Sequence, residues 1–128
     1  MSEEQDLPLD GIKIIEFTHM VMGPTVGVIL ADLGADVIKV EPIGGDNTRR
    51  LVGSGSGYFP MYNRNKKSIS LNLKSEEGLA VAHKLIANAD IMIENFRPGA
   101  MDKLGLGYDQ LKEINDQLIY CSEKGFLE

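Results

Sequence analysis

Apolar residues recur along the chain in short runs separated by stretches of a different spacing. The runs are rich in β-branched residues or alternate apolar with polar positions, which is typical of strands, and they cover residues 12–17, 35–41, 68–73, 90–94 and 117–122. Most of the intervening stretches place their apolar residues on one face of a helix. This alternation predicts an α/β fold, a Rossmann-like, doubly wound parallel sheet of about four strands with flanking helices.

Local signals place the ends of the expected helices. Pro24 stands in the first turn of a helix, where its missing N–H costs little, and Gly34 is suited to the left-handed residue that ends it. Ser75 precedes two glutamates and is a typical N-cap for the next helix. A short helix is expected over residues 108–115. We find no linker or internal repeat, so residues 1–128 are expected to form one Rossmann-like segment.

Polar and aromatic groups follow the expected strands at the points where they end. The run 91–93 leads into Asn95, Phe96 and Arg97, and the first strand leads into His19 and Met20. The carboxyl ends of parallel strands share one edge of a sheet, where ligands bind in such folds. A helix beginning at residues 99–101 would add free N–H groups that face an anion. The pattern therefore indicates half of a phosphate- or nucleotide-binding crevice.

Composition excludes several other classes of protein. The chain is 43% hydrophobic and 25% charged, as expected of a globular domain, and it lacks a run long enough to span a membrane. Its net charge of −6 argues against general nucleic-acid binding. The acidic amino terminus does not resemble a targeting segment, and the single cysteine, Cys121, fits a reducing compartment. We therefore expect a cytoplasmic protein that binds neither membranes nor nucleic acid.

The charges are unevenly distributed along the sequence. Residues 47–74 hold none of the 19 acids but six of the 13 cations, which are Arg49, Arg50, Arg64, Lys66, Lys67 and Lys74. A basic island in an acidic chain can focus a positive potential on an anionic ligand. The alternative is a solvated loop without acids, which the interleaved glycines and aromatic residues disfavour.

Five blocks follow one another along the sequence: LDGIKIIEFTHMVMGP, LADLGADVIKVEPIGGDNTR, YNRNKKSISLNLKSEEG, IMIENFRPGAMDKLGLGYDQLKEIN and LIYCSEKGF. In this order they resemble the family III CoA-transferases. The resemblance covers nearly everything from Leu9 to Phe126. It implies the amino-terminal part of the large domain of a longer enzyme, whose two subunits are interlocked. It also implies coenzyme A as the ligand, acyl-CoA and free carboxylic acids as substrates, and no metal.

The same resemblance implies a set of coenzyme-binding residues, which is Met20, Val21, Met22, Leu71, Lys74, Asn95, Phe96, Arg97 and Lys103. Two positions depart from the family pattern. A nucleotide-binding arginine of the family falls on Pro42, so that Arg49 or Arg50 would have to replace it. Lys103 stands in place of an arginine, which keeps the charge but loses the bidentate geometry.

The nucleophilic aspartate of the family falls beyond residue 128, so no catalytic residue is assigned in this chain. We expect the chain by itself to be inactive. In the complete enzyme, the resemblance implies that this carboxylate attacks an acyl-CoA thioester and forms a covalent intermediate, while the present segment holds the coenzyme.

Three other functions remain open at the level of sequence. The chain could belong to a racemase related to α-methylacyl-CoA racemase, which shares the same blocks. A NAD-dependent dehydrogenase would use the strand–helix–strand unit ending at Glu41, although its G-x-G-x-x-G motif is missing. The chain could also be a non-catalytic binding module. Thermal shifts with CoA and with NAD would distinguish a CoA-binding enzyme from a NAD-dependent dehydrogenase.

Overall fold

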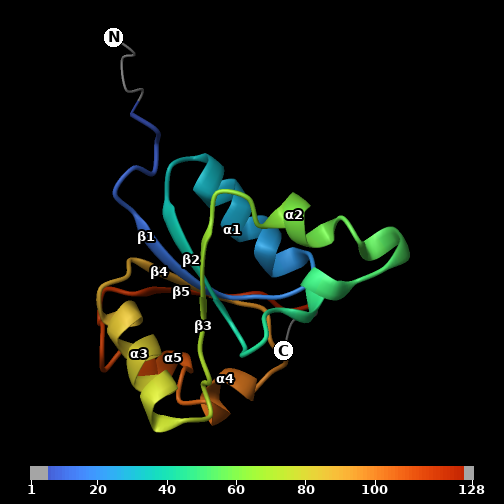
Figure 1. Cartoon of the computed structure of the whole chain (residues 1–128). Coiled ribbons are helices and arrows are strands. Elements are labelled where there is room, and N and C mark those ends of the chain that lie inside the picture. Colours follow the sequence, from blue (N-terminus) through green and yellow to red (C-terminus); the bar gives the residue numbers. More distant parts are fainter. Residues whose placement is uncertain (1–5, 126–128) are drawn as a thin grey trace.

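Five parallel strands form a single sheet in the computed structural model, which describes residues 6–125 (Figure 1). The strands are β1 (Lys13–Phe17), β2 (Asp36–Glu41), β3 (Lys67–Ser70), β4 (Ile91–Glu94) and β5 (Ile119–Ser122). The helices are α1 (Met22–Asp32), α2 (Tyr58–Tyr62), α3 (Glu76–Ala87), α4 (Ala100–Lys103) and α5 (Tyr108–Leu111), and two 3-10 turns are η1 (Asn47–Arg50) and η2 (Gly53–Gly55). The expected α/β architecture is confirmed.

The strand order in the sheet is β3-β2-β1-β4-β5, so β1 lies at the centre. Ile14 of β1 pairs with Val37 of β2 on one side and with Ile91 of β4 on the other. The sheet has five strands where about four were expected, because each of the five strand-like runs of the sequence contributes one. The β5 edge carries Ile119, whose side chain is 63% exposed.

The two faces of the sheet are covered by different helices, as in a doubly wound fold. The helices α3, α4 and α5 pack on one face against a core that includes Ile15, Phe17 and Met92. On the other face, α1 packs against Ile14 and Ile93. No helix within residues 6–125 is long and apolar enough to cross a membrane. The acidic residues 1–5, expected to lack a targeting signal, lie outside the described residues.

The local signals at helix ends act as the sequence predicts, although two elements are shorter than expected. Gly34 has a positive φ of 107°, and Ser75 Oγ accepts a hydrogen bond of 3.1 Å from Gly78 N. The third strand ends at Ser70 instead of residue 73, because the chain turns at Asn72, whose carbonyl accepts from Ser75 N. The helix expected over 108–115 ends at Leu111 and continues as hydrogen-bonded turns.

Charged side chains are buried among the apolar residues at the carboxyl ends of β1 and β2. Glu16 is fully buried, and its Oε1 lies 2.7 Å from Lys66 Nζ. Lys39 is 1% exposed, and its Nζ lies 3.2 Å from Asp46 Oδ2. Helix α1 approaches this layer closely at Gly27, where a Cβ atom would collide with the Glu16 carboxylate. The first helix therefore needs a glycine at this position.

The buried Lys39–Asp46 pair predicts a large effect of a single substitution. Lys39→Met leaves the Asp46 carboxylate buried without its cation, which costs about 3–5 kcal/mol of unfolding free energy. The matched control is Lys67→Met, since Lys67 is 71% exposed and pairs with Asp36 at the surface, where such pairs contribute about 1 kcal/mol or less. Urea unfolding of both variants measures the two costs. Similar midpoints for the two variants would contradict the assignment of the buried pair.

Candidate functional site

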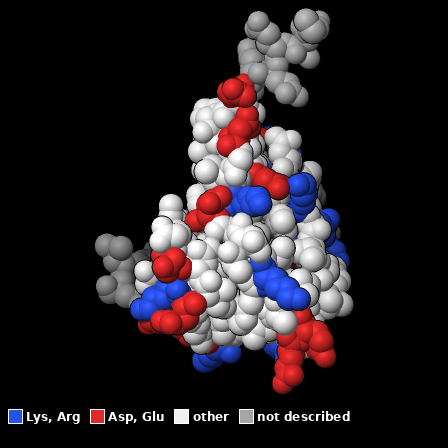
Figure 2. All heavy atoms as spheres, turned by 90° about the vertical axis from the view of Figure 1, so that its left-hand side faces the viewer, with Lys and Arg blue, Asp and Glu red and all other residues white. Residues whose placement is uncertain are grey.

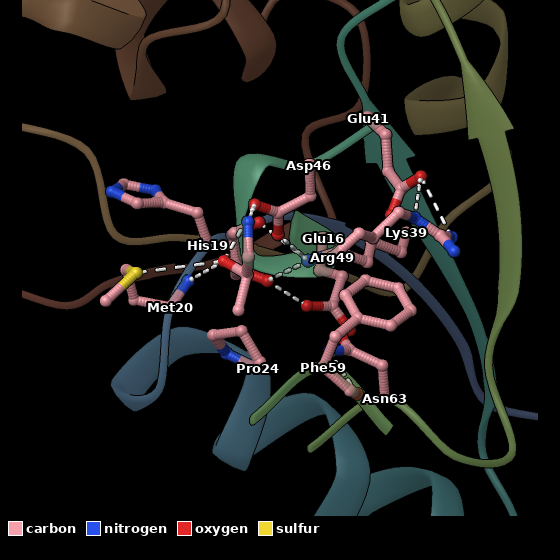
Figure 3. A network of polar contacts seen from close by, with 12 residues as sticks. Glu16, His19, Met20, Pro24, Lys39, Glu41, Asp46, Arg49, Phe59 and Asn63 are labelled. Atoms are coloured by element: carbon pink, nitrogen blue, oxygen red, sulfur yellow. Dashed lines mark hydrogen bonds and ion pairs between the residues drawn. The ribbon is translucent and has the colours of Figure 1, made fainter. Parts of the chain in front are cut away.

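The turn that follows β1 is held by a side chain from the neighbouring strand β2. Lys39 Nζ donates a hydrogen bond of 2.7 Å to the carbonyl oxygen of Thr18 and lies 3.3 Å from Thr18 Oγ1. Asp46 holds the same ammonium group from the other side (Figure 3). Burial raises the pKa of Asp46, but the hydrogen bonds from Thr48 and the Lys39 charge outweigh this and hold its pKa below the usual range. The Asp46 carboxylate therefore stays ionised.

The next residue of the turn is held by the loop after β4. Asn95 Oδ1 accepts a hydrogen bond of 3.1 Å from His19 N, and Asn95 Nδ2 donates one of 2.9 Å to His19 O. The His19 and Phe96 rings lie beside this clamp, with centroids 5.3 Å apart. Gly23 makes the close approach possible, since a Cβ there would lie 2.8 Å from Asn95 Cγ. His19 thus acts through its backbone N–H and carbonyl in this contact.

A cleft of about 960 Å³ opens where these two loops meet the segment after β3. Its walls combine apolar and aromatic side chains with two cations, Lys74 and Arg97, which are both exposed. The two carboxylates in its lining, Glu41 and Asp46, are each held by a cation. The cleft therefore suits a ligand that has both apolar or aromatic parts and anionic groups. In the part of the chain that the structure describes, no cluster of three or more metal-ligating side chains occurs.

Six of the nine site residues expected from the sequence line this cleft: Met20, Leu71, Lys74, Asn95, Phe96 and Arg97. The other three lie outside its lining. Val21 is the N-cap of α1, and its carbonyl accepts from Thr25. Met22 is the first residue of α1 and is 46% exposed, while Lys103 ends α4. The side chains of Met20 and Met22 are thus both at the surface and do not belong to the core.

The helix expected to begin at residues 99–101 is α4, and its first residue, Ala100, lines the cleft. The helix runs from Ala100 to Lys103, a single turn whose few aligned peptide dipoles give little field. The N–H of Ala100 already donates to the carbonyl of Arg97 at 3.0 Å. The anion site expected at the start of α4 thus stays a prediction, while the cations that line the cleft are Lys74 and Arg97.

The expectation that the cations of residues 47–74 form one basic island is wrong. Four of its six cations are paired with carboxylates from other parts of the chain: Arg49 with Glu41, Arg64 with Asp32, Lys66 with Glu16 and Lys67 with Asp36. Arg49 also lies over the Phe59 ring, 3.8 Å from its centroid. Neither Arg49 nor Arg50 is among the residues that line the cleft, whereas Pro42 is. Both signs of charge are intermingled on the face shown in Figure 2.

Several residues that shape the site were not singled out from the sequence. Lys39, Asp46 and Thr48 form the network behind the turn, and Glu16 anchors Lys66. A signal for two of them was present, because Glu16 and Lys39 each stand between two apolar residues within a strand. A charge in a buried strand needs a partner, although the sequence does not say which one.

Glu123, a half-buried residue just after β5, lies near Glu16, Glu94 and Lys66. Its Oε1 is buried and has no hydrogen-bond partner among residues 6–125. Burial raises the pKa of Glu123 from 4.5 to about 7, and the nearby carboxylates of Glu16 and Glu94 act in the same direction, while Lys66 opposes them. Glu94 itself is bound by Lys124, whose Nζ lies 2.8 Å from its Oε1.

The raised pKa of Glu123 predicts a pH dependence of stability. Between pH 4.5 and about 7 the folded chain binds more protons at this carboxyl than the unfolded chain, so its stabilising contribution is complete below pH 4.5 and is lost as the pH rises to 7. Glu123→Gln, which mimics the protonated acid, should flatten this part of the profile, whereas Glu113→Gln at an exposed position should not. Urea unfolding across this range measures both. Equal slopes in the two variants would refute the assignment.

The dehydrogenase alternative conflicts with the geometry at Glu41. A dehydrogenase would use this carboxylate to bind a ribose hydroxyl. In the structure Glu41 is 3% exposed, and Arg49 Nε lies 3.1 Å from both of its oxygens. The carboxylate is therefore already engaged.

Comparisons with known proteins identify the family. The sequence model of CoA-transferase family III matches residues 9–128. The acetyl-CoA:oxalate CoA-transferase of Acetobacter aceti is 50% identical over 123 residues, which are 93% of this chain and 32% of that protein. The succinyl-CoA:glutarate CoA-transferase of Homo sapiens is 44% identical over 124 residues, 93% of this chain and 28% of that protein.

Solved structures agree with this result. The crystal structure of a CAIB/BAIF family protein from Brucella suis matches with a TM-score of 0.88 and 48% identity, covering 95% of this chain and 34% of that one. The chain thus spans about a third of the length of the relatives it matches. Because the family model covers the chain from residue 9 to residue 128, the chain belongs to CoA-transferase family III.

Proposed function

We propose that this chain forms the coenzyme A-binding part of a CoA-transferase. The complete enzyme would move CoA between an acyl-CoA thioester and a free carboxylic acid, as the names of the oxalate and glutarate relatives describe for those proteins. The observation that carries the proposal is the cleft at the carboxyl ends of β1, β2 and β4, with Lys74 and Arg97 among apolar and aromatic walls. Coenzyme A combines a planar base, phosphates and an extended arm, which suits such a lining.

The carboxylates of the cleft suit coenzyme binding by this chain better than nucleophilic catalysis. Its two carboxylates, Glu41 and Asp46, are buried and bound by cations, which makes them poor nucleophiles for a thioester. We propose that the acyl group is carried by an aspartate of the family's remaining sequence, through a covalent intermediate. The present segment would keep the coenzyme in place between the two half-reactions. An interlocked homodimer is part of the same proposal.

The proposal is tested by the ligand preference of the chain. Coenzyme A should bind more tightly than NAD, because its 3′-phosphate adds charge that NAD lacks and that a guanidinium binds well. Isothermal titration of the chain with CoA, dephospho-CoA and NAD measures the three affinities. Equal affinities for CoA and NAD would contradict the proposal.

Arg97 is the residue to substitute in that assay. Arg97→Ala should raise the Kd for CoA by about tenfold, which is the loss expected for one charge-assisted hydrogen bond, and should reduce the preference for CoA over dephospho-CoA. The matched control is Arg64→Ala, since Arg64 is also exposed but pairs with Asp32 and lies outside the cleft lining. An unchanged Kd in the Arg97 variant would remove this residue from the site.

A further inference from the structure

Met20 has a backbone conformation that its residue type disfavours. Its φ of 63° lies in the left-handed region, which costs free energy for a residue with a Cβ atom. Its side chain is 42% exposed and lines the cleft, so packing of the side chain in the core does not hold it there. Another contact must therefore stabilise the turn at this residue.

The contact is a hydrogen bond from Met20 N to Thr48 Oγ1, with a length of 3.0 Å. The Thr48 side chain cannot rotate freely, because Oγ1 lies 2.8 Å from Asp46 Oδ1 and the backbone N–H of Thr48 donates to the same oxygen at 2.9 Å. Two acceptors lie near this hydroxyl, Asp46 Oδ1 at 2.8 Å and Met20 Sδ at 3.8 Å. Because the carboxylate is much the stronger acceptor, it takes the hydroxyl proton and leaves an oxygen lone pair for Met20 N–H. Asp46 is itself fixed by the ammonium group of Lys39, at 3.2 Å.

The position of the Met20 side chain depends on this series of contacts. Figure 3 shows His19 and Met20 projecting to the same side, away from the buried ion pairs. If φ at Met20 relaxed to a negative value, the side chain would leave its place in the wall of the cleft. Thr48 also borders the cleft but is only 2% exposed, and its hydroxyl is already engaged by Asp46 and Met20, so it would act on a ligand through Met20.

We propose that Thr48 is a positioning residue of the coenzyme site: its hydroxyl holds Met20 in the left-handed conformation, and the Met20 side chain placed in this way forms part of the wall that contacts bound coenzyme A. The inference rests on the proposed function for its ligand. The hydrogen bond from Met20 N to Thr48 Oγ1 does not depend on which ligand the cleft binds.

The test compares Thr48→Val with Thr48→Ser in the full chain. Valine keeps the shape but removes the acceptor for Met20 N–H, whereas serine retains the hydroxyl. Thr48→Val should accelerate hydrogen exchange of the Met20 amide and raise the Kd for CoA by about tenfold, while Thr48→Ser should stay within about twofold of the wild type in both measurements. A Thr48→Val variant that loses Met20 protection but binds CoA like the wild type would overturn the proposal.

A second variant decides the matter if Thr48→Val does not fold. Met20→Gly removes both the side chain and the unfavourable φ, so its unfolding midpoint should be no lower than that of the wild type. Its Kd for CoA should nevertheless rise by about tenfold, an effect that a purely structural role would not give. Wild-type affinity in Met20→Gly would overturn the inference. If the unmodified chain fails to bind CoA, the proposed function itself is wrong, and the exchange rate of the Met20 amide still tests the contact with Thr48.

Discussion

The buried ion pair between Lys39 and Asp46 is the interaction on which the site depends. A charge at this depth is tolerated because every partner is in place, and both ends of the pair reach the turn after β1. Lys39 binds the carbonyl of Thr18, and Asp46 orients Thr48, which binds the N–H of Met20. The sheet therefore supports the loop through charge as well as through packing.

The loop after β4 completes this support. Asn95 binds both backbone polar groups of His19, so three consecutive residues of the turn are held by side chains from β2, η1 and the β4 loop. Asn95 was expected to contact coenzyme, and its side-chain amide is partly used within the protein instead. One of its N–H bonds and one oxygen lone pair stay available, so it can both hold the turn and face a ligand. A cleft built in this way is formed before the ligand arrives, which reduces the ordering cost of binding.

Much of the fold followed from the spacing of apolar residues, while the pairing of charges did not. Strand and helix periods predicted the parallel sheet, and Gly34 and Ser75 correctly marked helix ends. Residues 47–74 looked like a basic surface because the carboxylates that pair with these cations lie in other parts of the sequence. Lys67 meets Asp36 across paired strands, and Lys66 meets Glu16 from the central strand. Such contacts depend on the register and packing of the folded chain, which a local pattern cannot specify.

In the proposed function, the turn of residues 18–20 and the loop after β4 form a preformed site for coenzyme A. The most direct test is a titration of the isotope-labelled chain with CoA, followed by two-dimensional NMR. The largest chemical-shift changes should fall on residues 18–20, 71–74 and 95–97, and the Met20 amide should exchange slowly both before and after binding. Largest changes around the smaller cavity lined by Ile15, Ile38 and Val81, or a Met20 amide protected by ligand alone, would contradict it.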